Sequence, residues 1–583
     1  MNYQYIQSNN FTEDSIKCLA DFTIEWIKEV LKGDKLSTML FLLGEHDDGD
    51  EIDKIENECN NYIAKCLIYT DEILNDSYVR NKIGNMMEKK IRQTKIGKLY
   101  VEGSYDFAIP DLYALCEHAF GMEVKGLLPS KYSWNKRWVE KGSSVVSMQR
   151  SPLVAPSENQ LRYISFDERC KEWYKYIYSG MIMSLWDTGM ARCSDADYDG
   201  DLLLVSDNQY LIEAIDDDAP MITYEKKKSK EQRLSVGNFA NIDVKSFDSK
   251  IGFITNLASN FLAMLSSFDK DSKEYKELRK RVDLLRRYQG DAIDATKGNV
   301  FTPPPKEWSR KQNYIEITDD MTENQKEIAQ QENKRIYELN KICGDRKPYF
   351  FGYIYQKFMV DYKRHKKNYN MMANMMYGDS LNNIISKQSK TQEEKDFVRK
   401  YYNNMPLLMN NCIMNVLTKY VEGVEFRNKW KIEKKEFDHH ILMSGKYQTD
   451  DNVLFDNVKK IIREFDRKYT IMVTERNEIK SFDLKDTREE GDKFSDELFM
   501  LVDEYENRLF GLCSNGRKLT DYIIEVYYTC YKDKSKFLLW GNFGDFILSN
   551  IKSKAKTACY PIFDENGTKY LNRSYSLRVV ELQ

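Results

Sequence analysis

At 583 residues the chain is too long for one compact core, and at about 100 to 200 residues per domain it predicts three or four folding units. Apolar residues make up 42% and aromatic residues 13%, so the 31% of charged residues belongs on the solvated faces of folded domains and general disorder is excluded. Because 88 Lys and Arg nearly balance 92 Asp and Glu, for a formal charge of -4, any nucleic-acid surface must be a local patch.

The cysteines, histidines and N-terminus point to a reducing, aqueous compartment. None of the 11 cysteines forms a C-x-x-C pair, and none of the five histidines joins them at zinc-ligand spacing. The N-terminus lacks a basic start and an apolar stretch, and no segment approaches about 18 uninterrupted apolar residues. We therefore expect a soluble cytoplasmic protein with no membrane partner. The richness in Asn, Lys, Tyr and Ile is typical of an AT-rich genome and suggests a bacterial or phage-infected cell.

The chain is expected to divide into four regions. Residues 1–94 carry apolar positions at three- and four-residue spacing and predict a helical N-terminal segment. Residues 95–218 have a different sequence pattern, with helical stretches at 111–121 and 167–178 between short runs of strand-forming residues. Those runs are GKLYVEG (97–103), SSVVSM (143–148), GMIMSLW (180–186) and DLLLVS (201–206). This pattern predicts a mixed α and β unit of barrel size.

The remaining two regions are expected to be mainly helical. Residues 219–300 contain two amphipathic stretches, 249–265 and 273–289. A proline-rich break at 301–308 then marks a boundary, because consecutive prolines cannot continue a helix. Residues 301–583 are charged and mostly helical, with a short strand pair near the C-terminus.

The segment CSDADYDGDLLLVSD carries the strongest chemical signal. Asp195, Asp197, Asp199 and Asp201 alternate, so in an extended loop several carboxylates face the same way and can converge on one hard cation. Gly200 lets the backbone turn tightly between the last two. Mg²⁺, with Mn²⁺ as the alternative, suits an all-oxygen site completed by water and substrate phosphates.

Two other interpretations of this segment stay open. D-x-D-x-D-G matches the first half of a calcium-binding helix-loop-helix, which would make the chain a calcium-regulated binding protein. The twelfth position of that consensus, however, is Ser206 and not Glu, and a β-rich run follows where a helix should begin. The second alternative is a solvated acidic turn, in which four neighbouring carboxylates would repel one another unless screened.

DYDGD (197–201) resembles the metal-binding loop of two-barrel RNA polymerases. That superfamily contains cellular multisubunit enzymes, RNA-silencing RNA-dependent polymerases and single-chain phage relatives. Further matches to its RNA-dependent branch occur in order along about 200 residues. They are the barrel entrance at 98–121, Arg-x-Pro in VVSMQRSP (145–152), a strand and Arg in GMIMSLWDTGMAR (180–192), a helix at 249–263, and GDAIDATKGN (290–299).

The resemblance implies an α+β fold with a double-psi β-barrel catalytic domain inside largely α-helical flanking domains. It implies that Asp197, Asp199 and Asp201 are the catalytic metal ligands, supported by Gly200. It also implies that Arg150, Arg192 and Lys297 bind substrate or nucleic acid, and that Asp294 belongs to the surround of the site. Asp195 precedes the motif and is expected to be a turn or supporting residue. Two of the basic residues also have local alternatives. Arg150 could form an ion pair with a nearby carboxylate, and Lys297 could stabilise the C-terminal end of a helix.

By this resemblance, the activity is template-directed RNA synthesis from NTPs by an RNA-dependent RNA polymerase-like nucleotidyltransferase. The alternatives are a DNA-directed phage-type polymerase subunit and a non-catalytic remnant or assembly subunit. In the superfamily a first barrel contributes lysines that face the aspartates, but only about 95 residues, helical in pattern, precede the expected barrel here. We therefore expect the first barrel in a separate partner chain, or a truncated or split polymerase.

Three further motifs give weaker functional signals. The basic run at 224–233 suits phosphate contacts, although a solvated loop is the simpler interpretation. The stretch 358–378 interleaves basic and aromatic residues, as single-strand binders do, while its methionines are expected to fill a core or a helix interface. The triplet Asp438, His439, His440 would suit a metallophosphoesterase only with accompanying motifs, and none accompanies it.

Overall fold

The computed structural model describes residues 1–44, 52–193, 196–223, 233, 235–247, 250–294, 301–433, 435–446, 449–482 and 488–582. The chain forms two compact units. Unit 1 comprises Met1–Asp21, Gln93–Ile354 and Phe358–Gly423, and unit 2 comprises Phe22–Arg92, Tyr355–Lys357 and Val424–Gln583. Two of the boundaries between the units fall inside the helices α2 (Glu13–Leu31) and α6 (Ser77–Lys95).

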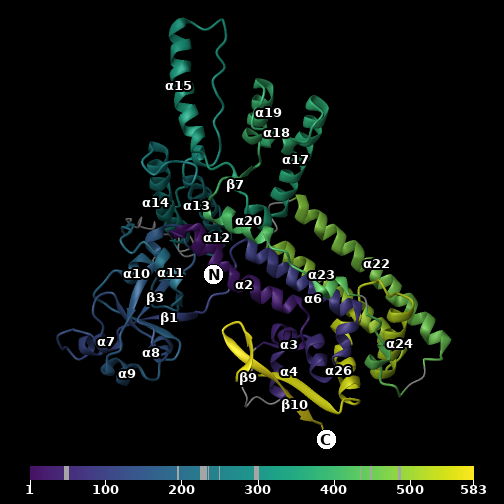
Figure 1. The fold of residues 1–583 in the computed structure, drawn as a ribbon. Helices are drawn as coiled ribbons and strands as arrows, with labels where there is room; N and C mark the ends of the chain where they lie inside the picture. Colours follow the sequence, from purple (N-terminus) through teal and green to yellow (C-terminus); the bar gives the residue numbers. More distant parts are fainter. Residues whose placement is uncertain are drawn as a thin grey trace. The chain divides into compact units, whose positions relative to one another are not determined.

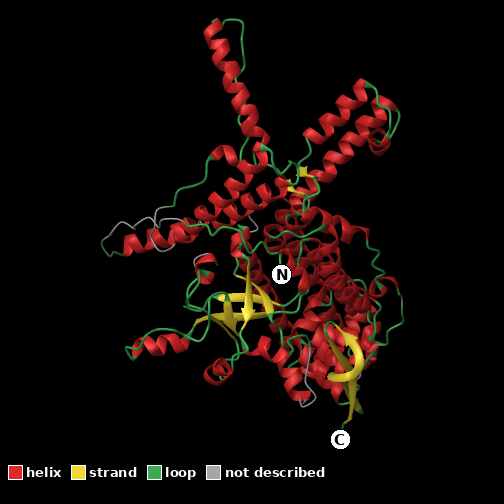
Figure 2. Ribbon diagram, turned by 60° about the vertical axis from the view of Figure 1, so that its left-hand side comes forward, coloured by secondary structure: helices red, strands yellow, loops and turns green. Residues whose placement is uncertain are grey.

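Six short strands in unit 1 close into a barrel with the cyclic order β1-β5-β2-β4-β3-β6. Figure 2 shows these strands gathered as one compact group. If β1, β2 and β3 exchange places with β4, β5 and β6, the same pairs of strands are still neighbours. The first three strands and the last three are therefore arranged alike and interlaced. Parallel pairing joins β1 to β5 and β2 to β4, and the other neighbours are antiparallel. The expected α+β fold with a double-psi β-barrel is confirmed. The strands are β1 (Ser104–Pro110), β2 (Tyr132–Trp134), β3 (Val145–Gln149), β4 (Gln160–Ile164), β5 (Gly180–Met183) and β6 (Leu202–Ser206).

The barrel interior is filled by side chains that alternate along these strands. Val146 and Met148 of β3 and Leu203 and Val205 of β6 are fully buried in one cluster, with Trp138 packed against it. Short helical segments connect the strands. They are α7 (Leu112–Ala119), α8 (Lys136–Lys141), η2 (Pro156–Glu158), α9 (Glu168–Tyr174) and α10 (Gly189–Arg192), and α11 (Gln209–Ala214) follows the last strand.

The predicted strand at 97–103 is wrong. Strand β1 begins only at Ser104, and the preceding residues are irregular, with Gly97 at φ +77°. Gly103 lies so close to the end of β6 that an added Cβ would stand 2.7 Å from the Val205 carbonyl oxygen. Strands β2 and β4 were not predicted, because they bury the polar residues Ser133 and Arg162 where a strand pattern predicts apolar ones.

After the barrel, unit 1 continues with α12 (Val236–Phe247), α13 (Ile251–Leu265) and α14 (Lys273–Asp294), so both predicted amphipathic helices are present. Helices α13 and α14 pack against each other around Phe261, Leu278 and Leu285, and Trp308 closes that core. A buried ion pair fastens α14 to the barrel, since Arg286 Nε lies 2.8 Å from Glu158 Oε1 and both side chains are at most 3% exposed.

Two helical projections extend from unit 1 (Figure 1). One is α15 (Glu323–Lys341), which runs beside an extended segment and binds it through two asparagines. Asn333 donates to and accepts from the backbone of Ile315, and Asn340 does the same with Gln312. The second projection is formed by α17 (Gln356–Tyr377), α18 (Leu381–Ser386) and α19 (Gln392–Asn403). The other elements of unit 1 are α1 (Tyr3–Ser8), η4 (Lys306–Trp308), β7 (Lys347–Pro348), α16 (Phe351–Ile354), β8 (Leu407–Leu408) and α20 (Ile413–Gly423).

Unit 2 is a helical assembly that also contains a β-hairpin. The hairpin pairs β9 (Thr557–Tyr570) with β10 (Arg573–Glu581), which confirms the predicted C-terminal strand pair. A single apolar cluster joins the hairpin to the helices through Ala558 and Tyr575. The helical elements are α3 (Lys35–Leu43), α4 (Ile52–Glu58), α5 (Tyr62–Tyr69), η1 (Glu72–Asn75), α21 (Lys429–Ile432), η5 (His439–Leu442), α22 (Asn452–Phe482), α23 (Arg488–Leu512), α24 (Gly516–Thr529), α25 (Phe537–Asn542) and α26 (Gly544–Lys552).

Candidate active site

Three aspartates meet in the loop that enters β6. Asp197, Asp199 and Asp201 each place a carboxylate oxygen within 4.8 Å of the others. The loop is folded by its own acids, because Asp201 accepts a hydrogen bond from the backbone N–H of Asp197 at 2.9 Å and Asp197 accepts one from Asp199 at 3.3 Å. The Asp201 carbonyl accepts from the Ala108 N–H of β1 at 2.9 Å. The last of the three acids is therefore fixed to the barrel wall, while the other two lie on its exposed rim.

Arg150 reaches this loop from the neighbouring strand. Strands β3 and β6 are antiparallel, with Gln149 opposite Leu204, so the residue after β3 comes beside the start of β6. Arg150 Nη2 lies 2.6 Å from Asp201 Oδ1, and the two side chains are 23% and 15% exposed. The structure therefore brings together Arg150 and Asp201, 51 residues apart in the sequence, as a half-buried ion pair at the aspartate loop.

Gly200 adopts a conformation that L-amino acids avoid. Its φ is +122°, and an added Cβ would meet nothing within 4 Å, so the need for glycine comes from the backbone and not from crowding. The residues after Asp201 form strand β6 and not a helix, which rules out the calcium-binding helix-loop-helix.

A second ion pair, which the sequence did not predict, supports the segment that leads into the loop. Arg162 of β4 is 2% exposed, donates to the Tyr132 carbonyl at 3.0 Å and pairs with Asp187 at 2.9 Å. Asp187 also accepts from the backbone N–H groups of Lys131 and Gly189, each at 2.7 Å. Burial acts to raise the pKa of Asp187, but the hydrogen bond and the charge of Arg162 hold that pKa below its usual value. The turn before α10 is thereby fixed from two sides.

Tyr198 lies between the first two aspartates of the motif, and the charges of Arg162 and Asp187 act on its hydroxyl. Burial raises its pKa, and the negative charge of Asp187 raises it further. The only signal for Arg162 and Asp187 in the sequence was an Asp-Thr-Gly turn before the motif, which has no specific chemical meaning by itself.

The other predicted residues have different outcomes. Arg192 ends α10 and donates from Nη1 to the Ala219 carbonyl at 3.1 Å. Asp294 is the last residue of α14, and its side chain is outside what the structure describes. Asp195 and Lys297 lie outside the described residues, as do nine residues of the basic run from position 224 to 232.

Helix α17 presents an exposed basic face in unit 1. Lys363, Arg364, Lys366 and Lys367 are exposed, and His365 between them stacks on Tyr401 at 5.1 Å. The prediction that the methionines of this helix fill a core or interface is wrong for four of them. Met371, Met372, Met375 and Met376 are 44% to 84% exposed, whereas the buried position on this stretch is Ala373.

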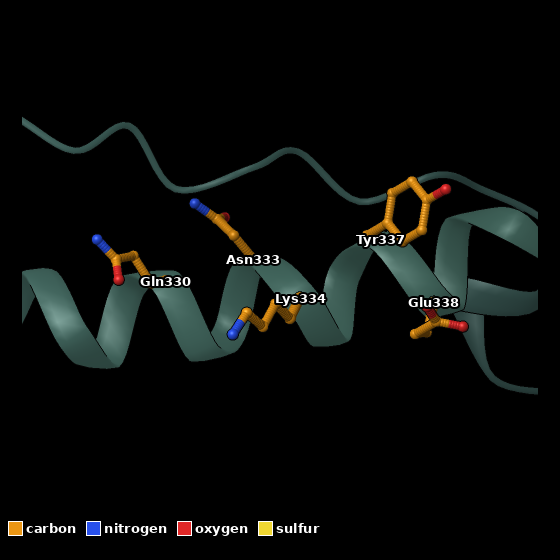
Figure 3. Close-up of a pocket in the computed structure, with 5 residues that line it drawn as sticks. All are labelled: Gln330, Asn333, Lys334, Tyr337 and Glu338. Atoms are coloured by element: carbon orange, nitrogen blue, oxygen red, sulfur yellow. The ribbon is translucent and has the colours of Figure 1, made fainter.

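A hollow of about 520 Å³ on α15 contains no catalytic cluster. It is lined by Gln330, Asn333, Lys334, Tyr337 and Glu338. Figure 3 shows Asn333 and Tyr337 pointing toward the neighbouring extended segment, where Asn333 makes its backbone contacts. The aspartate loop is therefore the better candidate for chemistry. Among the described residues, no helix is both long and apolar enough to span a membrane.

Comparison with known proteins gives one sequence relative and a looser structural likeness. No protein-family model matches the chain. The DNA-directed RNA polymerase YonO of Bacillus phage SPbeta is 25% identical over 264 residues, which cover 44% of this chain and 29% of that polymerase. The RNA-dependent RNA polymerase QDE-1 from Thielavia terrestris superimposes with a TM-score of 0.43 and 8% identity, over 95% of this chain and 57% of that one.

The matched segment spans less than a third of the phage polymerase, so the relationship concerns part of each protein. The barrel is established independently by its own strand order. Over this segment the chain is related to an RNA polymerase, as the motifs around DYDGD predicted.

Proposed function

We propose that this chain is a template-directed RNA polymerase that transfers nucleotides from NTPs to an RNA 3′-end. The observation that carries the proposal is the convergence of Asp197, Asp199 and Asp201 within 4.8 Å at the mouth of a closed β-barrel. The sequence relationship to a phage DNA-directed RNA polymerase supports the same chemistry. We place the activity in the cytoplasm of a bacterial or phage-infected cell.

The donor set fits Mg²⁺, or Mn²⁺ in its place. All three ligands are carboxylates, which hard divalent cations prefer, and oxygens about 2.1 Å from one Mg²⁺ stand roughly 3 to 4 Å apart in an octahedron. The observed spacing of at most 4.8 Å needs only a small contraction of an exposed loop. When bound, the metal polarises a phosphoryl group and stabilises the charge that develops during transfer.

The protein's own groups hold this site in shape. The backbone bond from Ala108 fixes Asp201 to the barrel, and Arg150 offsets part of the repulsion among the three carboxylates. Arg150 also supplies a half-buried cation within reach of an incoming triphosphate, where a guanidinium can bind phosphate oxygens in bidentate fashion. We propose that Arg150 exchanges Asp201 for substrate phosphate, and that Arg192, Lys297 and Asp294 belong to the surrounding surface.

Nucleic acid is proposed to bind on the basic face of α17. Four exposed cations lie within five residues of this helix, where they can pair with backbone phosphates. The metal chemistry is the same for an RNA and a DNA template, so the two templates are compared directly in the activity test. Similarity to a DNA-directed RNA polymerase of a phage favours a DNA template.

We further propose that a separate chain carrying the first barrel docks beside the aspartate loop. On the outer face of β1, Tyr105 is 65% exposed and Phe107 is 45% exposed, and Phe107 lies opposite Leu202, which is also 45% exposed. Leu202 directly follows Asp201. This apolar patch is therefore continuous with the acidic loop, so a partner covering it would bring its own residues to the metal.

The test is incorporation of labelled NTPs on single-stranded DNA and RNA templates with Mg²⁺. Wild type is compared with Asp199→Asn and with Asp271→Asn, which removes an exposed carboxylate elsewhere in unit 1. Each protein is assayed alone and with any small barrel protein with paired lysines that is encoded beside the gene. Template-dependent product lost only in Asp199→Asn supports the proposal. Absence of product in every arm would favour the second candidate, a non-catalytic assembly subunit.

A further inference from the structure

Unit 2 contains a second cluster of metal-binding groups, which the proposed polymerase chemistry does not use. Asp438, His439 and His440 each offer a ligand atom within 4.8 Å of the others. His440 Nδ1 lies 2.6 Å from Asp438 Oδ1, and the two imidazole rings stack with centroids 4.4 Å apart. One carboxylate and two imidazoles therefore gather at the start of η5.

The more buried histidine is held in a fixed orientation by α24. His439 Nε2 lies 3.1 Å from Glu525 Oε2, and the ring stacks on Tyr528 with centroids 5.3 Å apart and planes 1° from parallel. Tyr528 is itself anchored, because its hydroxyl donates to the buried carboxylate of Asp76 at 2.5 Å. Glu525 and Tyr528 are three residues apart on one face of α24. Glu525 bonds a nitrogen at the edge of the His439 ring, and Tyr528 packs against the face of that ring.

The backbone of the cluster is also secured. Lys554 Nζ donates to the carbonyl of His440 at 3.1 Å and to that of Met443. Asp438 accepts from the backbone N–H of His440 at 3.0 Å, which closes the turn on itself. The three ligand side chains therefore start from a fixed backbone and not from a free loop.

We propose that Asp438, His439 and His440 bind one divalent transition-metal ion, Zn²⁺ or a close analogue, with Glu525 as the carboxylate behind His439. Imidazole nitrogen and carboxylate oxygen are ordinary zinc ligands at about 2.0 to 2.2 Å, which places ligand atoms roughly 3.3 Å apart in a tetrahedron. A carboxylate that accepts from the second nitrogen of a ligating histidine fixes its tautomer and strengthens it as a ligand. The mixed nitrogen and oxygen set favours a transition metal over Mg²⁺.

Three protein ligands leave a fourth position for water. The three ligands lie at the start of η5, and Glu525, which bonds His439, lies on α24. Metal binding would therefore link these two elements. The metal site is distinct from the aspartate loop of unit 1 in both its residues and its preferred ion.

The site is tested by Co²⁺ and Zn²⁺ binding to the full chain without nucleotides, using calorimetry and the visible absorption of bound Co²⁺. The informative variant is His440→Ala, since this side chain is 67% exposed and its removal leaves the core intact. His118→Ala removes another exposed histidine, on α7, and serves as the matched control. Asp199→Asn is measured in parallel to separate any cation bound by the aspartate loop.

We expect wild type, His118→Ala and Asp199→Asn to share one Co²⁺ site, with nitrogen-ligand absorption bands, that Zn²⁺ displaces. His440→Ala should weaken that site at least tenfold, and Glu525→Gln should weaken it about 10- to 100-fold through loss of the orienting carboxylate. Equal Co²⁺ affinity in wild type and His440→Ala would overturn the proposal, as would the absence of the nitrogen-ligand bands in wild type. Because the readout is metal affinity, it stands apart from the polymerase assay.

Discussion

Substituting Gly200 by alanine isolates the contribution of loop geometry to metal binding. The φ of +122° is a conformation that costs an L-residue about 1 to 3 kcal/mol, while the added methyl group meets no atom within 4 Å. Gly200, Asp197 and Asp199 are exposed, and the hydrogen bonds that fold this loop lie within it, so we expect the metal-free loop to rearrange and relieve this strain. The strain must then be restored when the carboxylates converge on the ion.

We therefore expect Gly200→Ala to leave the unfolding midpoint nearly unchanged and to weaken Mn²⁺ binding by roughly 5- to 150-fold, the equivalent of 1 to 3 kcal/mol. Binding is measured by electron paramagnetic resonance of free Mn²⁺, and nucleotide incorporation is followed in the same samples. Gly121→Ala is the matched control, since Gly121 has φ +67° with nothing within 4 Å of its added Cβ.

Gly121→Ala should retain the wild-type Mn²⁺ affinity, because its strain lies outside the aspartate loop. Wild-type Mn²⁺ affinity in Gly200→Ala would refute the argument that the left-handed backbone aligns the carboxylates. A large loss of stability in Gly200→Ala would show instead that the metal-free loop does not relax.

Three further predictions follow from buried and half-buried charges. Arg150→Met should bind Mn²⁺ several-fold more tightly, because a competing cation leaves Asp201, yet it should incorporate nucleotides more slowly; equal affinity and rate would contradict this. Glu158→Ala should destabilise unit 1 by about 3 to 5 kcal/mol in urea unfolding by leaving Arg286 buried without its carboxylate, and a change below 1 kcal/mol would count against it. Burial raises the pKa of Asp466 to about 7, so its contribution to stability is greatest below about pH 4 and is lost as pH rises to 7. Asp466→Asn should therefore stabilise the protein at pH 8, by at most roughly 4 kcal/mol, and have little effect at pH 4; equal melting shifts at both pH values would refute this.

The sequence predicted the aspartate cluster because its geometry is local. Alternation along an extended loop brings carboxylates to one side, and Gly200 supplies the turn, so the convergence needed no knowledge of the tertiary fold. The position of Arg150 beside Asp201 depends instead on the β3–β6 register across 51 residues. The family resemblance predicted Arg150 near the substrate, and the competing expectation was an ion pair with a local carboxylate; no spacing rule named Asp201 as that carboxylate.

Elements that bury polar groups escaped prediction. Strands β2 and β4 are short, and they place Ser133 and Arg162 inside, where Arg162 donates to Ser133 and pairs with Asp187. Such a network has no hydrophobic period, so a pattern search finds no strand. The cluster at Asp438 was visible as a triplet, but its support from Glu525 lies 86 residues away along the chain and required the packing of α24.

The most direct test of the central claim is single-turnover addition of one nucleotide to an RNA 3′-end on a template, comparing wild type with Asp199→Asn at equal Mg²⁺. Removing one carboxylate from a catalytic metal site should cost about 3 kcal/mol of transition-state stabilisation, a loss of rate on the order of 100-fold. The account predicts that loss with an unchanged fold and with Asp271→Asn at the wild-type rate. Equal rates for wild type and Asp199→Asn would contradict it.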